Sequence, residues 1–209
     1  MEPLLSYLVG AIAALFPIVD PIGAIPIFYA LTAKQSHQRR CQQAKQVALN
    51  VAAVLTVFFL MGKGLLAFFG ISLPVVRIAG GLIVSHTAWQ MVTSQDRLTH
   101  REQTEAADKA DISLTPMAVP LLSGPGAIAM TISLSTRCHT WLEYLGVWLG
   151  ILLLSAMVYF LLILGEPLSQ AWGITGRGAL TRLLGFFILA IAVQFIADGS
   201  LALLQPLLR

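Results

Sequence analysis

The chain has 209 residues, of which 57% are hydrophobic and only 11% are charged, and its formal net charge is +3. Soluble domains are about a quarter charged, so this composition excludes a soluble globular domain and indicates a polytopic membrane protein in a lipid bilayer. The basic residues lie in loops beside apolar segments, where positive charge orients membrane proteins. We therefore expect no nucleic-acid partner.

Six apolar segments are each close to the roughly 20 residues that a helix needs to cross a bilayer. The predicted spans are 5–32, 46–67, 73–93, 113–135, 142–164 and 179–204. The predicted polar connections are 33–45, 94–112, 136–141 and 165–178, with a short turn near Gly70-Ile-Ser-Leu-Pro74 between spans two and three. The N-terminus has no basic segment of the kind that begins a cleavable signal, so its apolar run is interpreted as the first span.

The first span contains the stretch F-P-I-V-D-P-I-G-A-I-P-I-F at 16–28. Each of its three prolines lacks a backbone N–H and clashes with the carbonyl four residues before it, so a regular helix cannot pass undisturbed. Irregular backbone at membrane depth is tolerated only where protein or a water-filled cavity satisfies it. We therefore expect span one to be unwound around Asp20–Gly23.

A second broken stretch, Pro120-Leu-Leu-Ser-Gly-Pro-Gly-Ala-Ile128, lies in span four. The two stretches align so that Pro17 meets Pro120 and Gly23 meets Gly126. We expect span four to be unwound around Ser123–Gly126. The pair of broken segments is the main functional signal in the sequence.

The two halves of the chain show further collinear matches, which indicate a duplication. Arg77-Ile-Ala-Gly80 opens span three as Arg182-Leu-Leu-Gly185 opens span six, and Gly62 matches Gly165. The prediction is an all-α bundle in one transmembrane domain, with repeat A at 1–93, a linker at 94–112 and repeat B at 113–209. Three spans per repeat make the second repeat inverted, as in many secondary transporters. The alternative is that membrane helices share these residue types by composition alone.

Basic residues are distributed unequally between the two faces of the predicted bundle. One face carries nine, namely Lys34, Arg39, Arg40, Lys45, Arg97, Arg101, Lys109, Arg177 and Arg182, and the other carries Lys63, Arg137 and Arg209, with Arg77 at the membrane edge. Because basic loops stay in the cytoplasm, both termini are predicted to be periplasmic in a bacterial inner membrane.

Asp20 is the strongest candidate for chemistry, since an ionisable group inside a membrane span is costly and functional by default. It could carry a proton or pair with a substrate ammonium group. Alternatively, it caps the half-helix that begins after Pro21. One carboxylate could do both.

The two bends together suit a small zwitterion, because glycine lets the backbone approach a ligand and a half-helix N-terminus offers free N–H donors. N–H groups would bind its carboxylate, and carbonyls or Asp20 its ammonium group. The candidate binding residues are Asp20, Pro21, Gly23, Ser123, Gly124 and Gly126. The alternative is a pair of kinks that only shape the bundle.

Two further polar pairs lie inside the spans. Asp198 and Arg77 are expected near the outer membrane edge, where an ion pair would act as a structural latch or in coupling. His86 and Gln90 share a helix face at i, i+4 spacing, which fits hydrogen-bonded packing or a proton relay. The remaining histidines lack ligand spacing, so we expect no metal or cofactor.

These motifs, together with R-I-A-G-G and A-V-Q-F-I-A-D-G, resemble the MarC/SnatA family of bacterial and archaeal inner-membrane proteins over essentially the whole chain. The resemblance implies a six-span protein of the LysE exporter type that transports small neutral amino acids such as glycine and alanine. It carries Asp20, Gly23, Ser123 and Gly126 over as site candidates. The direction of transport and the oligomeric state stay open.

Other functions fit the sequence less well. An intramembrane aspartyl protease needs two facing carboxylates, and the only aspartates in the predicted spans, Asp20 and Asp198, lie at different depths. A passive channel needs a continuous polar stripe, whereas these spans carry isolated polar residues. We therefore expect no enzyme activity. A membrane scaffold, or an exporter of another small solute, remains the alternative.

Overall fold

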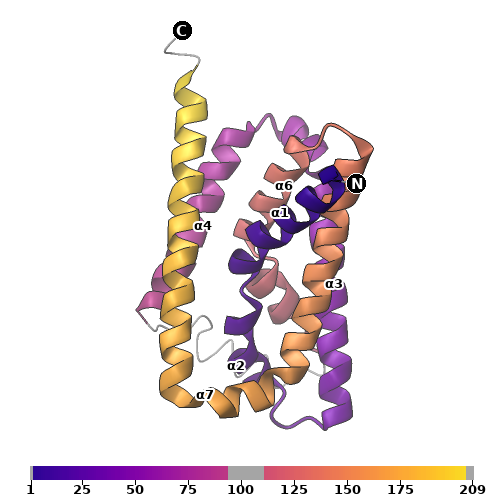
Figure 1. Ribbon diagram of the computed structural model, residues 1–209, viewed down its shortest axis with the longest axis vertical. Coiled ribbons are helices and arrows are strands. Elements are labelled where there is room, and N and C mark those ends of the chain that lie inside the picture. Colours follow the sequence, from indigo (N-terminus) through magenta and orange to yellow (C-terminus); the bar gives the residue numbers. More distant parts are fainter. Residues whose placement is uncertain (1, 94–110, 206–209) are drawn as a thin grey trace.

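In a computed structural model, the chain forms helices and no strands within residues 2–93 and 111–205, which are the residues that the structure describes. At 2, 166–177 and 180 it describes the backbone alone. The helices are α1 (Glu2–Val19), α2 (Pro21–Leu31), α3 (His37–Phe69), α4 (Leu73–Val92), η1 (Ser113–Leu122), α6 (Pro125–Arg137) and α7 (Trp141–Leu204). They form one bundle in which the start of α1 and the end of α7 lie at the same end (Figure 1). We call it the N-terminal end.

The first span is broken at Asp20, as predicted, but over a shorter stretch. Asp20 has φ 46° and ψ 62°, a left-handed conformation that only Gly and, less often, Asn and Asp adopt. The axis turns by 46° between Pro3–Val19 and Pro21–Leu31. Pro21 starts α2 at the position where a missing N–H costs nothing. Gly23 already belongs to α2, so the break is narrower than Asp20–Gly23.

The predicted fourth span is broken as well, between η1 and α6, with a bend of 66°. Inside η1, Thr115 and Val119 have extended backbone angles, because a residue that precedes proline is disfavoured in the α region. Between η1 and α6, Ser123 and Gly124 are outside the helices, and Gly126 lies in the first turn of α6. The distortion therefore ends before Gly126 but begins earlier than the predicted Ser123, at the non-helical residues inside η1.

Every predicted span coincides with one helix or a bent pair, but the six-span count is not confirmed. Within the described residues, three helices are long and apolar enough to cross a membrane, or up to five if each bent pair is one span. The three are α3 (His37–Phe69) and two parts of α7, Trp141–Gly165 and Thr181–Leu204. α4 has the predicted bounds of span three, yet it is not among them, since it carries several polar side chains.

Two predicted connections are helical instead. α3 begins at His37 rather than after Lys45, because Ser36 caps it by accepting the Arg39 N–H at 3.3 Å. The backbone of α7 is helical from Trp141 to Leu204, including the predicted connection 165–178, and Figure 1 shows it turning at the end opposite the N-terminal end. Polar composition therefore did not distinguish a helical segment from a loop. The linker prediction at 94–112 lies almost wholly outside the described residues.

Small residues bring helices of the bundle close together. A Cβ built on Gly146 would lie 2.6 Å from the carbonyl oxygen of Leu4, and one on Gly150 would lie 2.9 Å from that of Leu8. The G-x-x-x-G motif of α7 therefore packs against the backbone of α1 within one chain. α6 is enclosed by this bundle, and most of its residues are buried.

Candidate functional site

Asp20 caps α2 with its own side chain. Its carboxyl group is 4% exposed, and Oδ1 accepts the Gly23 N–H at 3.1 Å. A Cβ built on Gly23 would collide with Oδ2 of the same carboxylate, so only glycine lets Asp20 lie over the first turn. The capping interpretation is therefore confirmed, and a role for Asp20 in proton or amine binding stays a prediction.

The second break also begins a helix with a proline in its first turn, but without a capping carboxylate. Gly124 is the N-cap of α6, Pro125 follows it, and no side chain in the described chain caps this helix. A Cβ on Gly124 would lie 2.6 Å from the carbonyl oxygen of Pro120, which explains why a capping side chain is missing. The N–H groups of Gly126 and Ala127 have no partner within their helix. The first turn of α6 thus offers two donors for an anion.

Ser123 precedes this turn and carries an unsatisfied hydroxyl group. The residue is fully buried, and its backbone N–H donates to the Ala118 carbonyl at 2.7 Å. Its Oγ atom has no hydrogen-bond partner among the described residues. A buried polar group without a partner costs about 1–3 kcal/mol, so Ser123 is held in this place at a cost in stability.

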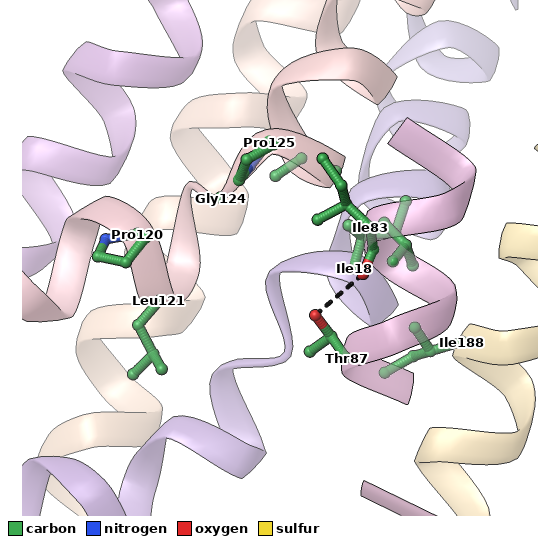
Figure 2. A pocket seen from close by; sticks show the side chains of 11 residues that line it. Ile18, Ile83, Thr87, Pro120, Leu121, Gly124, Pro125 and Ile188 are labelled. Carbon is green, nitrogen blue, oxygen red and sulfur yellow. Dashed lines mark hydrogen bonds between the residues drawn. The ribbon is translucent and has the colours of Figure 1, made fainter. Parts of the chain in front are cut away.

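A small cavity lies directly at the N-terminus of α6. Its volume is about 70 Å³. Figure 2 shows it bounded by the second break, by α4, by the end of α1 and by the C-terminal half of α7. The lining residues are Ile18, Ile83, Val84, Thr87, Pro120, Leu121, Gly124, Pro125, Gly126, Ala127 and Ile188.

The walls of this cavity are mainly apolar side chains. The one lining hydroxyl group is that of Thr87, whose Oγ1 donates to the Ile83 carbonyl at 3.2 Å (Figure 2). No other lining residue has a polar side chain, so the remaining polar groups at the cavity belong to the backbone. Since one water molecule needs roughly 10–15 Å³ in this measure of volume, the cavity holds on the order of five non-hydrogen atoms. It fits a very small molecule that binds through backbone donors.

The structure brings only some of the predicted binding residues together. Gly124 and Gly126 line the cavity, whereas Asp20, Pro21, Gly23 and Ser123 do not. Ile18 connects the two breaks, because a Cβ on Gly126 would lie 3.4 Å from Ile18 Cγ2. Asp20 is therefore two residues from the cavity wall along α1.

Thr87, Val84 and Ile18 are site residues that the sequence did not identify. Val84 and Ile18 are ordinary apolar residues of their spans, so no local pattern distinguishes them. Thr87 follows His86 in a short polar stretch of α4. That stretch was the available signal, since polar residues inside a span tend to face protein or a cavity.

Arg77 and Asp198 lie near each other but bond to different partners. Arg77 Nε donates to Ser133 Oγ at 3.1 Å, and Asp198 Oδ1 accepts from Gln194 Nε2 at 2.6 Å. A Cβ on Gly199 would lie 3.3 Å from Arg77 Cβ, which places the two charges on contacting helices. Neither hydrogen bond joins them directly, so a latch between them stays a prediction.

His86 and Gln90 are hydrogen-bonded to each other, with 3.1 Å between His86 Nε2 and Gln90 Nε2. His86 lies on an exposed face of α4, and neither side chain lines the cavity. The hydrogen bond fits the packing interpretation, and a relay through this pair stays a prediction.

A cluster of hydrogen-bonded polar side chains joins α3 to the start of η1. Asn50 Nδ2 donates to Ser113 Oγ at 3.1 Å, and the Ser113 N–H donates to Asp111 Oδ1 at 2.8 Å. The latter bond lowers the pKa of Asp111 below its ordinary value. These contacts fix the start of the segment that leads to the cavity.

Comparison with known proteins identifies relatives along almost the whole chain. The model of the MarC family integral membrane proteins matches residues 5–204. A UPF0056 membrane protein of Methanocaldococcus jannaschii is 37% identical over 198 residues, which cover 93% of this chain and 96% of the relative. The UPF0056 membrane protein YhcE of Escherichia coli is 32% identical over 93% of this chain and 92% of its own. YvbG of Bacillus subtilis, of the same description, is 31% identical over 93% and 94%. No solved structure matches the chain.

Proposed function

The chain belongs to the MarC family of integral membrane proteins, and from this premise we propose that it is a secondary transporter of small neutral amino acids, with glycine and alanine as substrates. One observation carries the proposal: a cavity of about 70 Å³ lies against the uncapped N-terminus of α6. This site sits at a broken helix, where secondary transporters hold their substrates.

The chemistry of the first break supports a carboxylate at the second. At α2, the Asp20 carboxylate already accepts an N–H of the first helical turn. At α6 the corresponding donors, Gly126 and Ala127, have no such partner and line the cavity. A substrate carboxylate would occupy the place that a protein carboxylate fills in the other half, favoured by the positive end of the helix dipole.

Cavity size supports the choice of substrate. Room for about five non-hydrogen atoms suits glycine, and alanine needs space for one atom more. Ile18, Val84 and Ile188 form apolar walls, which favour neutral side chains over charged ones. A hydrophobic pocket discriminates by about 1–3 kcal/mol per methylene, so we expect a graded preference rather than a single substrate.

Reciprocal contacts support the inverted repeat. A Cβ on Gly62 of α3 would lie 2.6 Å from Ile132 of α6, and one on Gly165 of α7 would lie 2.5 Å from Ile25 of α2. In each case the second helix of one repeat meets the half-helix that follows the break in the other repeat. Two-fold-related surfaces make contacts of this reciprocal kind.

The helices α4 and α7 behave in the same way. A Cβ on Gly81 would lie 2.9 Å from the Ala192 carbonyl oxygen, and one on Gly185 would lie 3.1 Å from that of Ala88. The third helices of the two repeats thus pack closely against each other at glycine residues, although these two glycines are not aligned with each other in the repeats. We propose six spans, with both termini in the periplasm of a bacterial inner membrane. The basic asymmetry and the shared end of α1 and α7 (Figure 1) support this orientation.

Asp20 is the proposed coupling residue. Protonation of its carboxyl group would weaken the charge-assisted bond to the Gly23 N–H. This bond stabilises the break between α1 and α2. Loss of the negative charge on Asp20 would therefore make the break less rigid, and Ile18, at the end of α1, connects the break to the cavity. A proton gradient could then drive the change of access.

The test is uptake of labelled glycine and alanine by proteoliposomes that contain the purified protein, with and without an imposed proton gradient. We expect uptake above that of empty liposomes, and faster uptake when a gradient is present. Uptake indistinguishable from empty liposomes under both conditions would reject the proposal and leave a scaffold, or a carrier of another small solute.

A further inference from the structure

A second hollow lies on the outside of the bundle, between α3 and the N-terminal half of α7. Its volume is about 380 Å³, within the range of about 300–1,000 Å³ that ligand pockets occupy. The lining residues are Lys45, Ala48, Leu49, Ala52, Leu152, Ser155, Ala156 and Tyr159. None of them lines the cavity at the second break, and we call this hollow the α3–α7 groove.

The groove is formed by two matching helix faces. On each helix the four lining residues follow the spacing i, i+3, i+4, i+7, which places them on one face. The helices are antiparallel (Figure 1), so Lys45 and Tyr159 lie at one end of the groove and Ala52 and Leu152 at the other. The groove therefore has one polar end and continues between apolar side chains.

The polar end lies at the depth of lipid headgroups. Lys45 and Lys63 are the two charged residues that flank the uncharged part of α3. Lys63 follows Lys45 by eighteen residues, a helical rise of roughly 27 Å, which is close to the hydrocarbon thickness of about 30 Å. Lys45 thus marks one boundary of the hydrocarbon layer. The groove extends from it toward the middle of the bilayer.

The walls of the groove suit an acyl chain rather than a polar solute. Ala48, Ala52 and Ala156 leave room between the helices because their side chains are small. The hydroxyl group of Ser155 donates to the Ile151 carbonyl of its own helix at 2.9 Å, so it needs no polar ligand. Lys45 is exposed, and its ammonium group and the Tyr159 phenol can both donate to a phosphate.

We propose that the α3–α7 groove binds an anionic phospholipid, with its phosphate at Lys45 and Tyr159 and one acyl chain along the alanines. Basic pockets between membrane helices on the cytoplasmic side bind such headgroups. The lipid would hold α3 against α7 without entering the transport cavity.

The test uses native mass spectrometry of the purified protein equilibrated with equal amounts of phosphatidylglycerol and phosphatidylcholine of identical chains. One lysine near a membrane surface contributes about 1 kcal/mol, so wild-type protein should retain phosphatidylglycerol roughly fivefold more than phosphatidylcholine. Lys45→Gln should abolish that preference. Lys34→Gln is the matched control, because it removes an equal charge from the same end outside the groove, and it should keep the preference.

A second variant tests the acyl chain. Ala52→Leu fills the groove and should reduce retention of both lipids, while gel filtration confirms an unchanged folded species. Equal retention of the two lipids by wild-type protein would overturn the proposal, as would equal losses in Lys45→Gln and Lys34→Gln. Displacement of phosphatidylglycerol by inorganic phosphate would overturn the lipid assignment. A dimer that Ala52→Leu dissociates, with lipid retention unchanged, would assign the groove to a second copy instead.

Discussion

Replacing Gly126 by alanine should change the selectivity of transport for substrate size, because side chains already occupy the space that the new methyl group would need. A Cβ built on Gly126 would collide with Val84 Cγ2 and lie 3.4 Å from Ile18 Cγ2. Val84 is 5% exposed and lines the same cavity. Val84 is packed against protein on its other sides, so its side chain must move into the cavity. The cavity would lose about one of its roughly five atom positions.

The magnitude follows from the cost of overpacking, which is about 1–3 kcal/mol. If that cost falls wholly on binding, it corresponds to roughly a fivefold to 150-fold loss of affinity for a substrate that needs the lost space. Alanine has one more non-hydrogen atom than glycine, so we expect the ratio of glycine to alanine uptake to rise about tenfold. The N–H group of residue 126 is kept, so the carboxylate contact survives. The assay is paired uptake of the two labelled amino acids by proteoliposomes.

Two variants make the reasoning refutable. Gly126→Ala combined with Val84→Ala removes the colliding methyl group and should restore alanine uptake toward wild type. Gly10→Ala is the matched control, because a Cβ at Gly10 meets nothing within 4 Å, and it should behave as wild type. An unchanged glycine-to-alanine ratio in Gly126→Ala, or no recovery in the double variant, would show that this cavity does not hold the substrate side chain.

Three other predictions concern coupling, topology and stability. Asp20→Asn should abolish gradient-driven uptake while the protein still reaches the membrane, since an amide oxygen can keep the bond to the Gly23 N–H; wild-type rates would reduce Asp20 to a cap. A reporter that is active only in the periplasm, fused after Arg209, should give signal, and a purely cytoplasmic signal would reject both the orientation and the span count. The folded-state pKa of Asp111 is lowered by the Ser113 N–H, so its stabilising effect is present above its unfolded pKa of about 4 and is lost as pH falls through the lower folded value. Asp111→Ala should therefore lower the midpoint of thermal unfolding at pH 7 but have little effect at pH 3, and an equal effect at both values would contradict the hydrogen bond.

The broken helices could be predicted from sequence because proline acts locally. Its missing N–H and its ring clash disfavour a regular helix through the proline itself and the residues just before it. The exact position of the break in span one could not be predicted, because it depends on the hydrogen bond between the Asp20 carboxylate and the Gly23 N–H. Asp20 adopts φ 46° with its carboxylate on the Gly23 N–H, and Pro17 and Pro26 are accommodated inside helices. Competing prolines therefore left several break points open.

The cavity could not be predicted from local sequence patterns. Its walls come from α1, α4, the second break and the far half of α7, which only the packing of the bundle brings together. Ile18 and Ile188 differ in no way from other apolar residues of their spans. Gly124 and Gly126 were found because glycine next to proline indicates close approach of backbone, and that signal is carried by the residues themselves.

The most direct measurement of the central claim is a competition series against labelled glycine uptake in proteoliposomes of the wild-type protein. The account predicts that unlabelled glycine, alanine and serine compete, in decreasing order of effect, and that leucine, lysine and glutamate do not. Glycinamide, which has no carboxylate for the first turn of α6, should compete poorly despite its small size. Equal competition by leucine, lysine and glutamate would contradict a small neutral cavity, and full competition by glycinamide would contradict a carboxylate site at the second break.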